Sequence, residues 1–140
     1  MKTFKEYIIE KKTFDKADVK TLNVLGQRIF DSNGKCKMYE VKWRTGAHPT
    51  DGMNDVRDRN ENPITMAHLI RILKKGIPQL CRRMEEFMNK KGCFIDKKTY
   101  TNLPFTVTDD ADGVINVNTN TAQNKKDYWL FPDQIPIYIN

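Results

Sequence analysis

Long apolar runs are missing from this sequence of 140 residues. No stretch approaches the roughly 20 apolar residues that a membrane-spanning helix needs, and the N-terminus lacks the apolar segment of a secretory signal. Internal repeats and low-complexity tracts are missing as well. We therefore expect a soluble protein without a membrane partner, of a length that fits one domain with a core of its own.

Cysteine is scarce, and its spacing suggests no cross-links. Cys36, Cys81 and Cys93 are odd in number and form no CxxC pair, so the sequence predicts neither a zinc site nor a disulfide framework. We interpret the three residues as buried or incidental thiols of a protein in a reducing compartment.

Motifs for nucleotide and metal chemistry are also missing. The chain contains no GxxxxGKS/T, GxGxxG, HExxH or GxSxG pattern, and nucleotide hydrolysis and zinc catalysis are therefore not leading hypotheses. Asp109, Asp110 and Asp112 crowd one turn, but they lack the ligand order and the terminal Glu of a calcium-binding loop. We expect no metal and no cofactor.

Positive charge is concentrated in one part of the chain. The formal net charge is +6, and residues 71–98 alone carry nine Lys or Arg against three acidic residues. Such a concentration predicts a nucleic-acid partner, because every neutralised phosphate releases counterions. A solvated helix face explains the same pattern without a partner, and both interpretations stay open.

Hydrophobic periodicity predicts helices followed by short strands. A first long helix has Asp18 as candidate N-cap and ends at the turn 31–34, and alternation predicts a strand over 35–44. Two tandem helices follow, 65–75 ended by Gly76 and 78–91 ended by Gly92. Antiparallel strands with a hairpin turn at 109–113 are expected over 93–95, 105–107, 114–117, 128–131 and 135–139. The fold class is therefore α+β, a single domain in which three to four helices pack on a small antiparallel sheet.

The first ten residues stand apart from this domain. Phe4, Tyr7 and Ile8 share one face at helical spacing, so residues 3–9 can form a short amphipathic helix, and the segment ends in Ile8-Ile9-Glu10. It resembles the capsid-targeting peptide of internal head proteins in T-even-like phages. The resemblance implies a propeptide over residues 1–10 that docks on the phage scaffold and is cut by the prohead protease after Glu10, with Ile8 as part of the processing site. It implies a mature domain of residues 11–140, located in the virion interior and then in the host cytoplasm. The alternative is an ordinary N-terminal helix packed on the domain.

A second resemblance begins at His48. His48-Pro49-Thr50-Asp51 is followed by Arg57 and Arg59, and then by a predicted helix that opens at Ile64-Thr65. This order is similar to that of small endoribonucleases of the RelE, barnase, EndoU and colicin-type group, with residues 40–140 covered in outline. The resemblance implies that His48, Arg57 and Arg59 are catalytic.

The chemistry of these side chains fits metal-independent RNA cleavage. A His that titrates near neutrality could act as base or acid, and two Arg could grip a phosphate and stabilise the phosphorane charge. Further nucleic-acid contacts are expected from Lys42, Trp43, Arg44, Lys74, Lys75, Arg82 and Arg83. The alternatives are a surface His48, loop ion pairs for Arg57 and Arg59, and core packing for Trp43. For His68 a structural role is favoured.

Hypotheses from two classes follow. In the first, the protein is packaged in a phage head, is ejected into the host with the DNA and acts as an effector, with metal-independent endoribonuclease activity as its candidate reaction. In the second, it is a noncatalytic internal head protein that binds DNA or RNA, or an inhibitor that binds a host defence protein. A catalytic cleft around His48 would favour the first class, and a flat basic face would favour the second.

Overall fold

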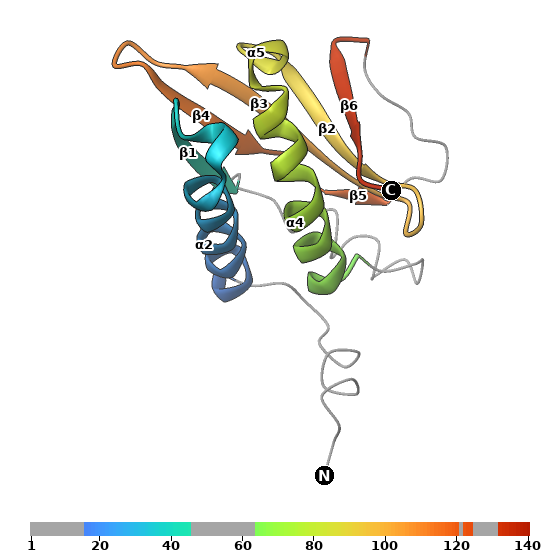
Figure 1. The fold of residues 1–140 in the computed structure, drawn as a ribbon. Helices are drawn as coiled ribbons and strands as arrows, with labels where there is room; N and C mark the ends of the chain where they lie inside the picture. Colours follow the sequence, from blue (N-terminus) through green and yellow to red (C-terminus); the bar gives the residue numbers. More distant parts are fainter. Residues whose placement is uncertain (1–15, 46–63, 121, 125–131) are drawn as a thin grey trace.

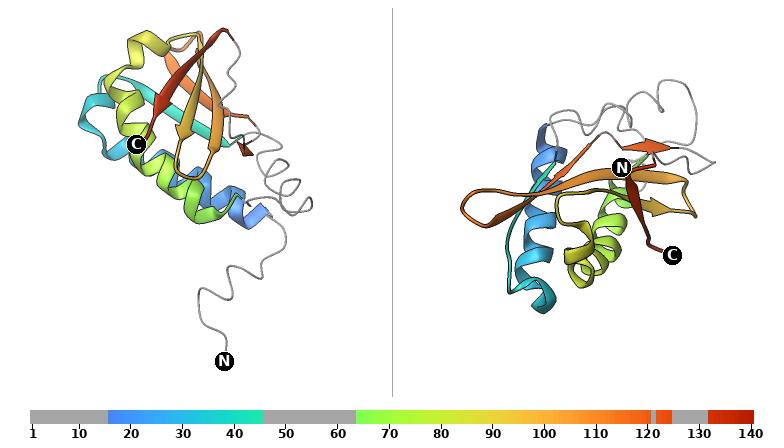
Figure 2. Two further views of the ribbon diagram at one scale, coloured as in Figure 1. Left: turned by 90° about the vertical axis from the view of Figure 1, so that its right-hand side faces the viewer. Right: turned by 90° about the horizontal axis from the view of Figure 1, so that it is seen from above.

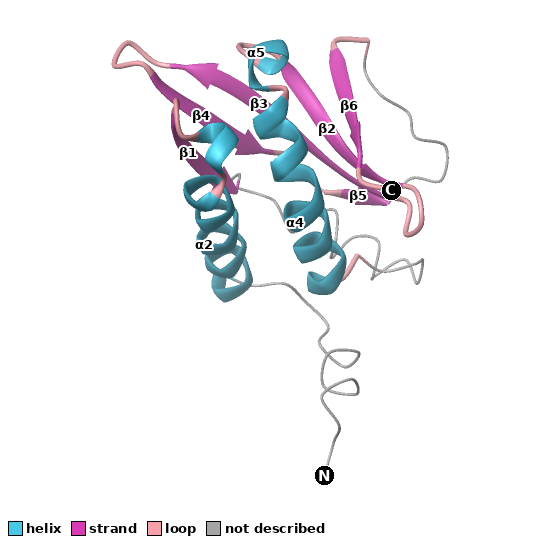
Figure 3. Cartoon of the chain, in the orientation of Figure 1, coloured by secondary structure: helices cyan, strands magenta, loops and turns pink. Residues whose placement is uncertain are grey.

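Two long helices lie side by side on one face of a six-stranded sheet (Figures 1 and 3). The computed structural model describes residues 16–45, 64–120, 122–124 and 132–140. Within these ranges the helices are α2 (Lys16–Ser32), α4 (Met66–Arg82) and the short α5 (Met84–Phe87), with a 3-10 helix, η1, at Gly34–Cys36. Figure 2 shows the helical layer on one side of the sheet. No helix in the described ranges is long and apolar enough to cross a bilayer.

The sheet is mixed. Its strands are β1 (Glu40–Thr45), β2 (Lys91–Asp96), β3 (Thr101–Asp109), β4 (Val114–Thr119), β5 (Gln123–Asn124) and β6 (Gln134–Tyr138), in the order β1-β4-β3-β2-β6 with β5 beside β3. The central pairs β2–β3 and β3–β4 are antiparallel, as predicted, but the outer pairs β1–β4 and β2–β6 are parallel. Parallel strands need a long connection, and the one between β1 and β4 contains α4, α5, β2 and β3. The predicted α+β class is confirmed, with a mixed sheet in place of a wholly antiparallel one.

The β3–β4 hairpin turn lies where the sequence predicts it. Asp110 Oδ1 accepts hydrogen bonds from the N–H groups of Asp112 (2.9 Å) and Val114 (3.0 Å), and Gly113 takes a left-handed φ of +80°. These bonds, with the N–H of Val114 as the main cause, hold the pKa of Asp110 below its ordinary value. The Asp110 carboxylate therefore serves the turn itself.

Helix α4 corrects two predicted helix ends. It continues through Gly76 and Pro78 without a break. Gly76 lies against the buried ring of Phe94, where an added Cβ would come within 2.5 Å of Cδ1, and that ring in turn stacks on Phe105. Close packing, and not a chain turn, therefore requires glycine here. The segment predicted as a second helix contains the last turns of α4, all of α5 and the start of β2.

Helix α2 packs on β1 through a glycine. Leu22, Gly26 and Phe30 repeat every four residues and are buried, and Gly26 leaves room for the indole of Trp43 on β1. Asp18 lies within the first turn of α2 and not at its N-cap, because the helix begins earlier than predicted. The predicted strand over 35–44 is shorter in the structure, since η1 occupies its first part.

Two of the three cysteines are paired. Cys36 of η1 and Cys81 of α4 form a disulfide, which corrects their interpretation as unpaired thiols. Sequence spacing could not show that η1 folds back onto the C-terminal part of α4. Cys93 is free and buried, as predicted, and burial raises the pKa of its thiol to about 12.

Side-chain amides of α2 close the β1 edge of the sheet. The Gln27 amide donates to the carbonyl of Val41 (2.8 Å) and accepts from the N–H of Trp43 (2.9 Å). Asn23 accepts from the N–H of Thr45. These amides take the place of a neighbouring strand, so outward backbone groups of β1 are already bonded.

The opposite edge, β6, is closed from α4 and from Arg83, the residue that follows it. Gln79 donates to the carbonyl of Tyr138 (3.2 Å), and Arg83 donates to the carbonyl of Pro136 (3.5 Å). Pro136 also has no N–H to offer to another strand. Both edges of the sheet are therefore protected by the two helices that cover its face.

Candidate functional site

The predicted catalytic and processing residues lie outside the described ranges. His48, Arg57 and Arg59 fall between β1 and α4, and Ile8 and Glu10 precede α2. The roles predicted for these five residues stay predictions. The seven residues expected to contact nucleic acid all lie in the described ranges, six of them in helices or strands and Arg83 between α4 and α5, and the structure separates them.

Three of the seven lie on the outer face of the helical layer. Lys74, Lys75 and Arg82 of α4 are exposed, while the opposite face of that helix is buried in the core. Lys20 and Arg28 of α2 are exposed in the same layer, and sequence reasoning missed them although both fall on the polar face of the predicted helix. We define these five residues as the helical basic surface. None of them forms an ion pair with another residue of the described ranges.

Arg83 is held away from this surface. Its guanidinium donates two hydrogen bonds to Glu86 (2.8 and 2.9 Å), lies over the ring of Phe87 and reaches the carbonyl of Pro136. The hydrogen bonds between the two side chains raise the pKa of Arg83 and lower the pKa of Glu86. We therefore assign Arg83 to closure of the β6 edge.

Lys42 and Arg44 lie on the other side of the molecule. Buried and exposed residues alternate along β1, and the buried ones face α2, so both cations project from the sheet face opposite the helices. Glu40 is exposed on that same face. Lys42 also contributes to the lowered pKa of Asp110, after the hydrogen bonds of the turn. Positive and negative groups are therefore interspersed on this face.

Trp43 packs in the core. Its side chain is 6% exposed, its ring centroid lies 5.9 Å from that of Phe30, and it fills the space left by Gly26. A ring enclosed in this way has no free face on which a base could stack. The structure therefore favours the interpretation of Trp43 as a packing residue.

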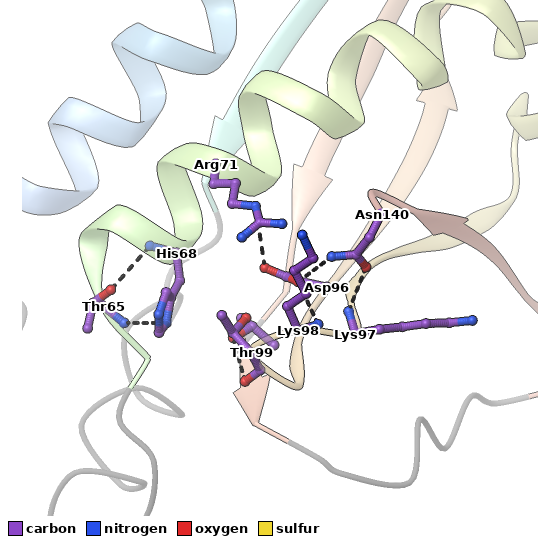
Figure 4. Close-up of polar contacts among 9 residues, drawn as sticks. Thr65, His68, Arg71, Asp96, Lys97, Lys98, Thr99 and Asn140 are labelled. Carbon is purple, nitrogen blue, oxygen red and sulfur yellow. Dashed lines mark hydrogen bonds and ion pairs between the residues drawn. The ribbon is translucent and has the colours of Figure 1, made fainter.

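A group of polar side chains gathers where α4 meets the β2–β3 turn (Figure 4). Asp96 is fully buried, and its Oδ1 accepts from Asn140 Nδ2 and from the N–H of Lys98, each at 2.9 Å. Arg71 Nε lies 3.9 Å from Oδ2. Burial would raise the pKa of Asp96, but the hydrogen bonds from Asn140, Thr99 and Lys98 and the charge of Arg71 outweigh it, and the pKa is lowered. Sequence reasoning missed Asp96, whose one signal in the sequence is an acidic residue at the end of a predicted apolar strand.

His68 lies beside this group and caps α4. Its N–H donates to the hydroxyl of Thr65 (3.2 Å), and the N–H of Thr65 donates to His68 Nδ1 (3.4 Å), which together form a capping box. An Nδ1 that accepts a hydrogen bond leaves the proton of the neutral ring on Nε2, so the outer nitrogen is a donor and not a base. Burial lowers the pKa of His68, which favours this neutral form. These contacts support the structural role predicted for His68.

The described part of the chain thus has two notable groups of polar residues. One is the helical basic surface, and the other is the cluster around Asp96, which links α4, the β2–β3 turn and Asn140. The His, Cys, Asp and Glu residues of the described ranges nowhere gather in threes as they would around a metal ion. Comparisons of the chain with protein-family models, with curated proteins and with solved structures found no match.

Proposed function

We propose that the protein binds nucleic acid, without catalysis, through the helical basic surface. The observation that carries this proposal is the exposure of five cations on two packed helices, each without an ion pair to another described residue. Lys and Arg side chains in this state can neutralise phosphates and release their counterions, which supplies most of sequence-independent binding. The basic face agrees with the noncatalytic hypothesis drawn from the sequence.

The distribution of charge supports the helical face as the contact. Acids interrupt the sheet face, where Glu40 shares a strand with Lys42 and where Asp133 pairs with Lys91 (3.4 Å). On the helical layer the exposed acids lie at the C-terminal ends of the long helices: Asp31 is three residues from Arg28 in the last turn of α2, and Glu85 and Glu86 of α5 follow Arg82. Lys74 and Lys75 lie on a helix that contains no acidic residue. A polyanion responds to the summed field of such a surface, so we expect it to approach the helices first.

Three other hypotheses stay open as predictions. The first is an inhibitor of a host defence protein; addition of a strand is the mode of binding that the contacts disfavour, because Gln27 of α2 occupies the β1 edge and Gln79 and Arg83 occupy the β6 edge. RNA cleavage depends on His48, Arg57 and Arg59, which lie outside the described ranges. Packaging in a phage head depends on residues 1–10, which also lie outside them.

The test is a binding titration of the full chain with two matched variants. Fluorescence anisotropy of a labelled nucleic acid, at several salt concentrations, compares the wild type with Lys74→Ala/Lys75→Ala/Arg82→Ala and with Lys42→Ala/Arg44→Ala. We expect the first variant to lose about three units of the salt-dependence slope, about one for each phosphate contact. The second variant should bind as the wild type does. Equal weakening by both variants, or no binding by the wild type at low salt, would overturn the proposal.

A further inference from the structure

On the basis of the proposed function, we infer that the ligand of the helical basic surface is a double-stranded nucleic acid. Each strand is held by its phosphates, and the base sequence is not read. Three features of the surface point to this ligand: the cations form two rows, the helical layer is wide, and the side chains between the cations offer bases nothing to stack on.

The five cations form two rows on neighbouring helices. Lys20 and Arg28 lie eight residues apart on α2, and Lys74 and Arg82 lie eight residues apart on α4, with Lys75 next to Lys74. At 1.5 Å per residue, each row is about 12 Å long. The helices contact each other and run in the same direction from the same end of the layer (Figure 1). A duplex offers two lines of phosphates, one for each row, whereas a single strand offers one.

The helical layer is too wide to enter a groove. A helix with its side chains is about 10 Å across, and the axes of packed helices are about 8–10 Å apart. Together α2 and α4 therefore span about 20 Å, and the major groove of B-form DNA is about 12 Å wide. The layer has to lie across a groove, where its outer side chains reach the backbones on both sides and not the base edges.

The side chains between the cations provide no platform for unpaired bases. Helix α4 contains no Phe, Tyr or Trp, and Phe30, the aromatic residue of α2, is buried. Positions among the cations hold Thr21, Val24 and Pro78 instead. Proteins that bind single strands use exposed aromatic rings on which successive bases stack. This surface can bind phosphates, but it has no exposed aromatic ring to replace the base stacking that a duplex loses when its strands separate.

The test compares duplex and single-stranded ligands of equal length. Salt titrations by fluorescence anisotropy are made with duplex DNA, duplex RNA and single-stranded DNA, for the full-length wild type, for Lys20→Ala/Arg28→Ala and for Lys74→Ala/Lys75→Ala. Five phosphate contacts predict a slope of log K against log salt of about −4.5 on a duplex. We expect each pair of substitutions to reduce that slope by about 2. Duplexes of different sequence should bind alike, and the single strand should bind more weakly.

The outcomes distinguish the duplex from the wider proposal. Tighter binding of the single strand than of either duplex would overturn the duplex and leave nucleic-acid binding standing. An unchanged slope for Lys20→Ala/Arg28→Ala would do the same, because both rows are required. No binding of any of the three ligands by the wild type at low salt would overturn both. The changed side chains are all exposed, and thermal unfolding equal to that of the wild type verifies that each variant is folded.

Discussion

Reduction of the disulfide between Cys36 and Cys81 should lower the stability of the protein by several kcal/mol. The two cysteines are 45 residues apart in the sequence. A cross-link over a loop of that length removes about 13 cal/mol/K of entropy from the unfolded chain, or ~4 kcal/mol at 25 °C. At about 3 °C for each kcal/mol in a domain of this size, the midpoint of thermal unfolding should fall by about 12 °C. The disulfide would then supply a large share of the roughly 5–15 kcal/mol that stabilises a typical domain.

Thermal and urea unfolding, with and without a reductant, measure this difference. Alkylation in denaturant followed by mass spectrometry counts the free thiols, and Cys93 is expected as the one free thiol before reduction. The control is Cys36→Ala/Cys81→Ala, which should unfold like the reduced wild type and should not respond to the reductant. Three alkylated thiols before reduction, or a loss of less than about 1 kcal/mol on reduction, would refute the loop-closure reasoning.

Four further results are expected. Pro78→Ala should raise the free energy of unfolding by about 1 kcal/mol in urea denaturation, because the interior of α4 regains a hydrogen bond that outweighs the lost rigidity of proline; a decrease would show that the helix breaks there. Gly26→Ala should lower it by about 2 kcal/mol, since the new methyl group overlaps the Trp43 ring, and an unchanged value would show that the ring moves aside. Burial lowers the pKa of His68 below 6.5, so the unfolded state binds more protons, and stability present above pH 6.5 should be lost as the pH falls through the folded-state pKa. Urea unfolding at several pH values should show this loss in the wild type and not in His68→Gln, and equal losses in both would contradict it. On the hypothesis that residues 1–10 are a propeptide of a phage head protein, mass spectrometry of protein from phage particles should find Lys11 as the first residue, whereas an intact N-terminus would exclude processing.

Local patterns predicted the parts of the fold that local interactions determine. The turn at 109–113 is specified by Asp110 and Gly113, whose hydrogen bonds and φ act within the turn itself. The buried faces of α2 and α4 follow from apolar residues at helical spacing. Gly76 and Pro78 misled the prediction, because an isolated Gly or Pro more often marks the end of a helix. Here the reason for Gly76 is the ring of Phe94, which is remote in the sequence.

Sequence patterns could not predict which distant segments of the chain contact each other. Nothing in the alternation of β1 shows that its neighbour is β4 or that the pair is parallel. The spacing of Cys36 and Cys81 gives no sign that η1 meets α4. Gln27 on a helix face looks like a solvated residue, yet it bonds the backbone of β1. Each of these features can be predicted only when the tertiary arrangement of the segments is already known.

The sequence predicts that residues 71–98 are basic, but it does not predict which cations share one face of the molecule. The excess of Lys and Arg in residues 71–98 is visible in the sequence. It cannot show that Lys42 and Lys74 lie on opposite faces of the molecule, or that Arg83 is engaged by Glu86. Lys20 and Arg28 join the surface because α2 packs beside α4, and that contact is again long-range.

Helix α4 keeps its core contacts and its cations on opposite faces. Leu73 and Ile77 are buried on one face, while Lys74 and Lys75 are exposed on the other. Removing an exposed charge leaves no cavity, and such substitutions usually change stability by less than about 0.5 kcal/mol. The helices that present the cations also close both edges of the sheet, so strand addition does not compete for a partner. Loss of binding in Lys74→Ala/Lys75→Ala can therefore be attributed to lost phosphate contacts and not to a lost fold.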